Sequence, residues 1–187
     1  MNITISETAN LPTKYGQFKI KSFKENEKEH LAIYKEPLED GLIVRVHSEC
    51  LTGDALGSQK CDCGEQLSFA LNLIDEKCGM VIYLRQEGRN IGLVNKVNAY
   101  ALQDKGLDTV EANHQLGFSA DGRTYEMVKF ILDHFGIKSI KLLTNNPSKI
   151  NSIDGVEIIE RLPIIIDSNT HNENYLQIKK SKMGHLL

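Results

Sequence analysis

The sequence lacks any long apolar run, and it lacks a signal for export. No stretch approaches the roughly 20 apolar residues that a membrane-spanning helix needs. The first residues, Met1–Glu7, have neither the basic start nor the apolar core of a signal peptide. Hydrophobic residues make up 41% and charged residues 25% of the 187 positions, as in an ordinary soluble protein. We therefore expect a cytoplasmic protein without a membrane partner.

The sequence also lacks an excess of positive charge and is poor in aromatic residues. The net charge is −3, so the chain as a whole does not attract nucleic acid. Aromatic residues are only 6% of the chain, which further disfavours a module that stacks on bases. A polyanionic ligand would need a local cluster of cations, and most candidates lie in glycine-punctuated stretches: Arg45, Lys60, Arg85, Arg89, Arg123 and Lys149.

Cysteine is scarce, but three of the four cysteines fall in one short polar loop. In an extended segment alternate side chains share a face, so Cys61 and Cys63 can direct both sulfurs at one point. The glycines of the loop let the chain turn back, so that Cys50 completes the set. Three thiols in one loop of a chain with no secretory segment favour a reduced metal site over a disulfide.

A set of three cysteine ligands predicts a catalytic zinc ion, one per chain. Thiolate-bound zinc is tetrahedral, and three protein ligands leave the fourth position for water or substrate. Such a zinc ion lowers the pKa of its bound water to about 7. The alternative is a structural zinc ion whose fourth ligand is Cys78 or His47. We expect Cys78 at a helix end as a small buried hydrophobe, whereas His47 lies on a strand and can face either side.

The first part of the chain has the patterns of an antiparallel sheet. Apolar and polar residues alternate over 14–23, and two further β patterns follow over 31–34 and 41–47 with short turns between them. Residues before about position 10 are polar, and we expect them to be less ordered.

The second part of the chain alternates between helical and strand patterns. Helices are predicted over 65–74, 93–103 and 124–135, and strands over 80–84, 140–144 and 156–166. This order favours a partly parallel sheet covered by helices. Residues 108–122 have no clean period and are predicted to be mostly loop, of a length that is usually functional. The fold class is therefore α/β, with a mixed sheet and an antiparallel N-terminal part, in one domain over 1–187 that is less ordered from about 170.

Four predicted strand ends carry polar or glycine-rich sequence, and ligands bind at such ends in sheets of this kind. The segments are 47–49, 85–92, 121–123 and 144–149. Arg85 and Arg89, on either side of Gly88, could grip phosphates bidentately. Taken alone, the segments 85–92, 121–123 and 144–149 also fit an ordinary turn or helix cap, but the convergence of all four segments favours a ligand site.

Six motifs are long enough to indicate a family: Arg45-Val-His-Ser-Glu-Cys-Leu-Thr-Gly-Asp, Cys61-Asp-Cys-Gly, Arg85-Gln-Glu-Gly-Arg-Asn-Ile-Gly-Leu93, Ala112-Asn-His-Gln-Leu-Gly-Phe118, Leu143-Thr-Asn-Asn-Pro147 and Lys182-Met-Gly-His-Leu-Leu187. Together they resemble GTP cyclohydrolase II from about Leu11 to the end. Some members of that family are fused to an N-terminal dihydroxybutanone phosphate synthase. No such domain is present in this sequence, so the resemblance implies the single-function form.

The resemblance implies three hydrolytic events on GTP in the first step of riboflavin biosynthesis. Pyrophosphate leaves, the guanine imidazole ring opens at C8, and that carbon is lost as formate. The product would be 2,5-diamino-6-ribosylamino-4(3H)-pyrimidinone 5′-phosphate. The resemblance further implies a homodimer, and Mg²⁺ is expected with the triphosphate.

The resemblance also implies roles for individual residues. Cys50, Cys61 and Cys63 would bind zinc, Asp121 would accept protons, and Tyr100 would lie near the base. Nucleotide contacts would come from Arg45, Val46, His47, Ser48, Glu49, Gln66, Glu87, Gly88, Arg89, Thr109, Thr144 and Lys149. Arg123 is the proposed nucleophile toward the α-phosphate. A guanidinium with a pKa of about 12.5 is rarely neutral at pH 7, so we expect Arg123 instead to stabilise phosphoryl charge while water attacks.

The rival interpretation is a catalytically inactive paralogue that keeps zinc for stability and acts as a binding or assembly module. Such a protein would preserve the fold and lose site residues. The three cysteines, Asp121 and Arg123 are all in place, which favours the enzyme.

Overall fold

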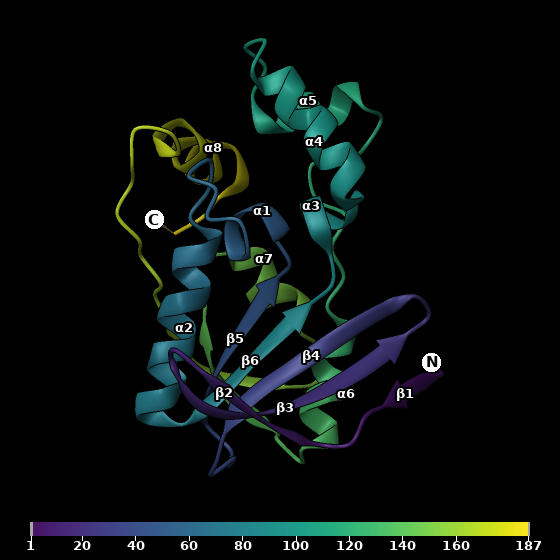
Figure 1. Cartoon of the computed structure of the whole chain (residues 1–187), viewed down its shortest axis with the longest axis vertical. Helices are drawn as coiled ribbons and strands as arrows, with labels where there is room; N and C mark the ends of the chain where they lie inside the picture. Colours follow the sequence, from purple (N-terminus) through teal and green to yellow (C-terminus); the bar gives the residue numbers. More distant parts are fainter. Residues whose placement is uncertain (1, 187) are drawn as a thin grey trace.

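A mixed eight-stranded sheet runs through residues 2–186, the part of the chain that the computed structural model describes (Figure 1). The strand order is β1-β3-β4-β6-β5-β7-β8, and β2 also pairs with β3. The strands are β1 (Ile3–Ile5), β2 (Ala9–Thr13), β3 (Gly16–Glu25), β4 (Lys28–Lys35), β5 (Leu42–Ser48), β6 (Gly79–Leu84), β7 (Ser139–Leu143) and β8 (Glu157–Leu162).

The sheet is antiparallel in its first part and parallel in its second part. Strands β1 to β4 pair antiparallel, and β4 pairs antiparallel with β6. Strand β5 is parallel to both of its neighbours, β6 and β7, and β7 is parallel to β8. The predicted α/β class with an antiparallel N-terminal part is confirmed. The carboxyl ends of the four parallel strands therefore lie at one edge, where ligands bind in such sheets.

The helices are α1 (Leu51–Asp54), α2 (Cys63–Lys77), α3 (Glu87–Asn90), α4 (Gly92–Gln103), α5 (Thr109–Gln115), α6 (Glu126–His134), α7 (Pro147–Ser152) and α8 (Glu173–Met183). Helices α2 and α6 cover opposite faces of the sheet. Successive side chains along a strand point to opposite faces, so the packing of one strand shows this. On β6, Met80 and Ile82 pack in the cluster that contains α6, whereas Val81 packs in the cluster that contains α2. Within residues 2–186, no helix has the length and apolar character needed to cross a membrane.

The N-terminal residues are more regular than their polar sequence predicts. Both β1 and β2 pair with the edge of β3 that β4 leaves free, one at each end of it. Ile3 and Ile5 pack against one core cluster and Leu11 against the other. Strands of three and five residues are too short to give a clear period, so tertiary pairing with β3 decides their conformation. Met1 and Leu187, which also fall in segments predicted to be less ordered, lie outside the described residues.

The segment predicted to be mostly loop contains α5. Its N-terminus has a capping box, in which the Asp108 side chain accepts from the backbone N–H groups of Val110 and Glu111, at 2.7 and 2.9 Å. The Glu111 side chain in turn accepts from the N–H of Asp108 at 2.9 Å. The Asp108-to-Glu111 spacing is itself a known start signal for a helix. Figure 1 shows α4 and α5 standing beyond the carboxyl edge of the sheet, across from α8.

Candidate active site

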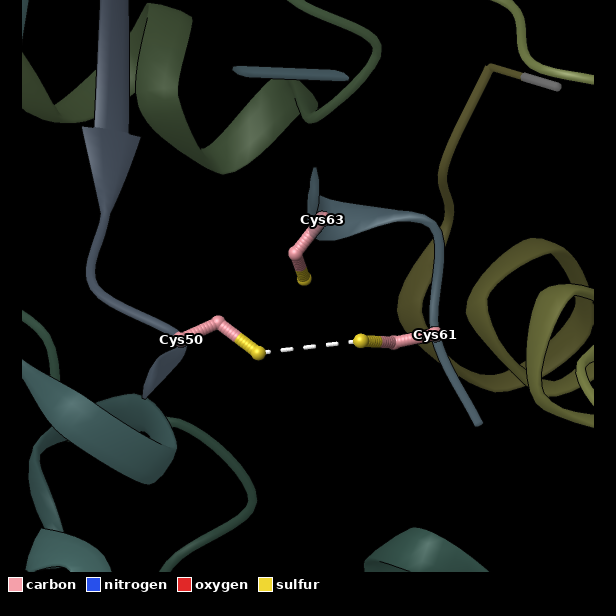
Figure 2. Close-up of side chains that lie close together, drawn as sticks. All are labelled: Cys50, Cys61 and Cys63. Atoms are coloured by element: carbon pink, nitrogen blue, oxygen red, sulfur yellow. Dashed lines mark hydrogen bonds between the residues drawn. The ribbon is translucent and has the colours of Figure 1, made fainter. Parts of the chain in front are cut away.

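Three cysteine sulfurs converge where β5 ends and α2 begins. Cys50 precedes α1, Cys61 lies just before α2, and Cys63 is the first residue of α2. All three sulfurs lie within 4.8 Å of one another, and those of Cys50 and Cys61 are 3.6 Å apart (Figure 2). Zinc–sulfur bonds of about 2.3 Å in a tetrahedron place sulfurs roughly 3.8 Å apart. The spacing and the donor type therefore fit a zinc ion.

Two glycines make this convergence possible. A Cβ atom on Gly53 would lie 2.9 Å from the Cys61 sulfur and 3.2 Å from the Cys50 sulfur. A Cβ atom on Gly64 would lie 2.4 Å from the carbonyl oxygen of Gly53. Side chains at these positions would force α1 away from the start of α2, so the absence of a Cβ atom holds the sulfurs together.

Neither of the fourth ligands considered from the sequence joins this group. The metal-binding group found among residues 2–186 consists of Cys50, Cys61 and Cys63. The Nε2 atom of His47 lies 3.1 Å from both carboxylate oxygens of Asp54. Cys78 ends α2 as predicted, but it is only partly buried, and its thiol donates to the carbonyl of Glu36 at 3.0 Å. The metal-binding group found among the described residues therefore has three cysteines and no fourth protein ligand.

Asp54 fixes the cluster to the ends of β5 and β6. Its carboxylate accepts from the N–H of Cys50 at 2.9 Å and from the hydroxyl of Tyr83 at 2.8 Å, in addition to its contact with His47. The His47 ring stacks on Tyr83 with centroids 5.4 Å apart. Burial lowers the pKa of His47, so the imidazole is neutral at pH 7. This side of the metal group is therefore rigid before any ligand binds.

Lys96 is a site residue that the sequence analysis missed. It projects from α4, and its ammonium donates to the Cys50 sulfur at 3.1 Å and to Glu87 Oε1 at 2.7 Å. Burial by itself lowers the pKa of Lys96, but Glu87 and Cys50 raise it overall, so the amine is charged. Hydrogen bonds from Cys61 and Cys63, together with Lys96, lower the pKa of the Cys50 thiol, which favours the thiolate that metals bind.

A cavity of about 330 Å³ opens beside the sulfurs at the carboxyl edge of the sheet. Its volume is in the range of small-molecule sites. Besides the three cysteines, the predicted residues that line it are Arg45, His47, Ser48, Glu49, Gln66, Glu87, Gly88, Arg89, Tyr100, Thr109, Arg123, Thr144 and Lys149. Two predicted residues do not line it. The Val46 side chain is in the core, with its carbonyl accepting from Lys149 Nζ at 2.7 Å, and Asp121 pairs with Arg123, which does line the cavity.

Buried basic residues line the cavity. Arg45 and Lys149 are buried, and within residues 2–186 neither forms an ion pair. Arg45 donates to Gln66 and to the carbonyl of Leu143. Burial, reinforced by Arg45 and Arg123, lowers the pKa of Lys149. Buried basic groups without a paired acid make the cavity suited to a polyanion.

Similarity to known proteins agrees with this geometry. The family model described as GTP cyclohydrolase II matches residues 4–163. The chain belongs to the GTP cyclohydrolase II family. A protein of Campylobacter hominis called GTP cyclohydrolase-2 is 63% identical over 187 residues, which are all of this chain and 97% of that protein. One from Helicobacter hepaticus is 55% identical over the whole of both chains. One from Sulfurospirillum multivorans is 70% identical over 141 residues, which cover 75% of this chain and all of that protein.

Among solved structures, a two-domain 3,4-dihydroxy-2-butanone 4-phosphate synthase from A. baumannii is 21% identical, with a TM-score of 0.46 over 88% of this chain and 40% of that chain.

Arg123 and Asp121, which the family resemblance singled out, form a tight pair. The Arg123 Nε–H donates to Asp121 Oδ1 at 2.8 Å, and its Nη2 also donates to the carboxylate. Burial by itself lowers the pKa of Arg123, but the contact with Asp121 raises it overall. Burial alone raises the pKa of Asp121, but Arg123 lowers it overall. Both groups are therefore charged at neutral pH.

The structure separates two arginines that the sequence places together. Arg89 lines the cavity and donates to the carbonyl of Ala120 at 3.1 Å. Arg85 instead pairs with Glu49 at 2.9 Å, with its side chain 47% exposed, and does not line the cavity. The backbone at Gly88 and Arg89 is left-handed, with φ of 61° at both, which turns the chain between the two arginines. The expectation that Arg85 and Arg89 both grip phosphates is therefore wrong for Arg85, whereas Arg89 lines the cavity.

Helix α8 adds a wall to the cavity that the sequence analysis did not foresee. Tyr175 and Lys179 line the cavity, and Lys179 Nζ donates to Asp62 Oδ1 at 2.6 Å. The other oxygen of Asp62 accepts from the Gln66 side chain at 2.6 Å, and Gln66 accepts from Arg45. A chain of polar contacts thus ties α8 to Arg45.

Substitution of Gly53 tests the packing that brings the sulfurs together. In Gly53→Ala we expect the zinc content of the purified protein to fall below about a tenth of the unsubstituted value, because the new methyl group overlaps two sulfur positions. Zinc is measured by elemental analysis, with the fold checked by circular dichroism.

Gly57→Ala is the matched control in the same loop. Gly57 has φ +66°, so alanine strains the backbone there, but its Cβ would meet no atom within 4 Å. We expect this variant to keep its zinc. Equal zinc retention by both variants would contradict the role assigned to Gly53.

Proposed function

We propose that this chain converts GTP to 2,5-diamino-6-ribosylamino-4(3H)-pyrimidinone 5′-phosphate, with release of formate and pyrophosphate, in riboflavin biosynthesis. Family membership and full-length relatives called GTP cyclohydrolase-2 support this activity. The observation that carries the proposal is that one cavity is lined both by a three-thiol group and by buried cations. A nucleoside triphosphate requires both, a centre that hydrolyses its base and cations that bind its phosphates.

At the base end, Cys50, Cys61 and Cys63 would hold the zinc ion. When bound, zinc supplies a water molecule activated at neutral pH for both carbon–nitrogen cleavages. Tyr100 lies beside the cluster, with its hydroxyl 3.3 Å from Thr52 Oγ1. Burial raises the pKa of Tyr100, so the phenol keeps its proton and can donate a hydrogen bond to the purine.

Several buried polar atoms of the residues that line the cavity have no partner among residues 2–186. They are Arg45 Nε, His47 Nδ1 and Ser48 Oγ, and all three residues line the cavity. Buried polar groups are almost always hydrogen-bonded, so these atoms indicate a ligand with acceptor oxygens and donors of its own. A bound triphosphate would also place negative charge beside Lys149. We propose that Mg²⁺ bridges the phosphate oxygens, which omission of Mg²⁺ from the assay tests.

Arg123 would stabilise charge on the transferring phosphoryl group rather than attack it. Its bidentate contact with Asp121 raises its pKa overall, which makes a neutral guanidinium still scarcer. Asp121 is ionised in this pair and can accept a proton from the attacking water. Release of pyrophosphate would then need no covalent enzyme intermediate.

We also propose that the enzyme is a homodimer. Helix α4 presents an apolar face away from the core, and Val94 and Val97 on it are 75% and 52% exposed. An exposed apolar face of this kind is typical of an interaction surface, and sedimentation of the purified protein tests whether it joins two chains.

Substitution of Cys61 tests the function. In Cys61→Ser we expect formate release from GTP to fall by about 100-fold or more, because a hydroxyl is a poor zinc ligand, while the protein stays folded. Formate and zinc are measured on the same preparation. Cys78→Ser is the control, because Cys78 lies outside the cluster, and its formate release should stay within about twofold. Full activity of zinc-free Cys61→Ser would overturn the assignment, and absence of formate from the unsubstituted protein would favour an inactive paralogue.

Substitution of Arg123 tests the phosphoryl step. We expect Arg123→Ala to release pyrophosphate about 1,000-fold more slowly, which is the usual effect of losing an arginine that stabilises a phosphoryl transition state, and Arg123→Lys to recover part of the rate. Arg85→Ala, which removes an arginine outside the cavity, should lose less than about tenfold. Mass spectrometry of the unsubstituted enzyme during turnover should find no guanylyl group on Arg123, and a covalent adduct there would refute the role.

A further inference from the structure

The ammonium of Lys96 is buried against the metal group, and the roles described above do not use it. Lys96 is 8% exposed, and its Nζ atom lies 3.1 Å from the Cys50 sulfur. The lysine comes from α4, which does not contribute a cysteine. A buried lysine is uncommon unless it is paired, so its position beside a sulfur calls for a physical reason.

Glu87 holds the lysine in place. Its Oε1 atom accepts from Lys96 Nζ at 2.7 Å and from the N–H of Gly88 at 2.9 Å. Its Oε2 atom accepts at 2.6 Å from the N–H of Leu51, the residue that follows Cys50. Glu87 therefore contacts both the lysine and the backbone beside the sulfur that the lysine reaches. The contacts form a closed set that fixes the direction of the ammonium toward Cys50.

The charge of the loaded metal centre gives this contact a purpose. A divalent zinc ion with three thiolates carries one net negative charge. A buried negative charge is unfavourable unless it is paired. An ammonium already within hydrogen-bond distance of one sulfur offsets that charge and needs no rearrangement to do so.

Lys96 also links the metal group to Tyr100, the residue that the proposed function places near the purine. Lys96 and Tyr100 are four residues apart on α4, so they share one face of the helix. The ammonium lies 5.7 Å from the centroid of the Tyr100 ring. Holding Lys96 against Cys50 therefore also sets the position of Tyr100 over the cavity.

We propose that Lys96 is a positioning residue of the metal centre: its ammonium, held by Glu87, donates to the Cys50 sulfur, offsets the charge of the zinc–thiolate group and docks α4 onto the site. This inference rests on the zinc site of the proposed function. Residues that contact metal ligands in this way change metal affinity or activity by about 10–100-fold when they are replaced.

The test is the zinc affinity of Lys96→Met, measured by competition with a chromophoric chelator at pH 7. We expect zinc to bind about 10–100-fold more weakly than to the unsubstituted protein. Lys96→Gln, which keeps a polar donor without the charge, provides a milder change and should also lose affinity. Lys129→Met is the control, because Lys129 lies on α6 and does not line the cavity, and its side chain is 43% exposed and pairs with Asp133; its zinc affinity should stay within about twofold.

A spectroscopic measurement separates this role from a general loss of folding. Co²⁺ alone replaces zinc in each variant, and the sulfur-to-cobalt charge-transfer band is recorded. A thiolate that loses a hydrogen bond becomes a better electron donor, so the band should move to lower energy in Lys96→Met and stay unchanged in Lys129→Met. Zinc affinities within twofold of the unsubstituted protein together with an unshifted cobalt band would overturn the proposal. If the unsubstituted protein itself bound no zinc or released no formate from GTP, the proposed function would fail instead.

Discussion

The structure depends on the close packing of α1 against the start of α2. Gly53 leaves room for two sulfurs, and Gly64 lets its own backbone approach the carbonyl of Gly53. This contact turns three cysteines, which are 13 positions apart at most along the chain, into one group of donors within 4.8 Å. Asp54 then fastens the group to the ends of β5 and β6. Because these contacts lie at the carboxyl edge of parallel strands, the metal group faces the cavity rather than the core.

The cavity combines two kinds of chemistry that the proposed substrate requires. Sulfur donors and a phenol with a raised pKa would act on the carbon–nitrogen bonds of the base. Buried arginine and lysine side chains would bind the phosphates. Helix α8 contacts Asp62, between Cys61 and Cys63, through Lys179, and α4 contacts Cys50 through Lys96. Both helices therefore contact the segment that carries the metal group.

The sequence predicted the class of fold and the metal group because these depend on local patterns. Alternating strands and amphipathic helices indicated a mixed sheet with an antiparallel first part, and the cysteine spacing indicated one common point. The nucleotide-contacting residues came from the family resemblance, and the structure places nearly all of them around one cavity.

The features that the sequence did not predict depend on tertiary contacts. Helix α4 exposes its apolar residues Val94 and Val97 and buries Lys96. An interpretation that turns the apolar face of the helix toward the core therefore places this lysine on the wrong face. The polar end of the chain contains α8, and this helix is held by the contact of Lys179 with Asp62, which lies more than 100 positions earlier in the chain. No local pattern contains that pairing. Among these features that were not predicted, only α5 had a local sequence signal, the capping box formed by Asp108 and Glu111.

The central claim is that three cysteines hold a zinc ion whose fourth position remains open to water or substrate. X-ray absorption at the zinc edge of the purified, substrate-free protein measures the ligand set directly. The account predicts three sulfur neighbours at about 2.3 Å and one lighter neighbour, oxygen, at about 2.0 Å. A fourth sulfur, or the multiple-scattering pattern of a coordinated imidazole, would contradict it.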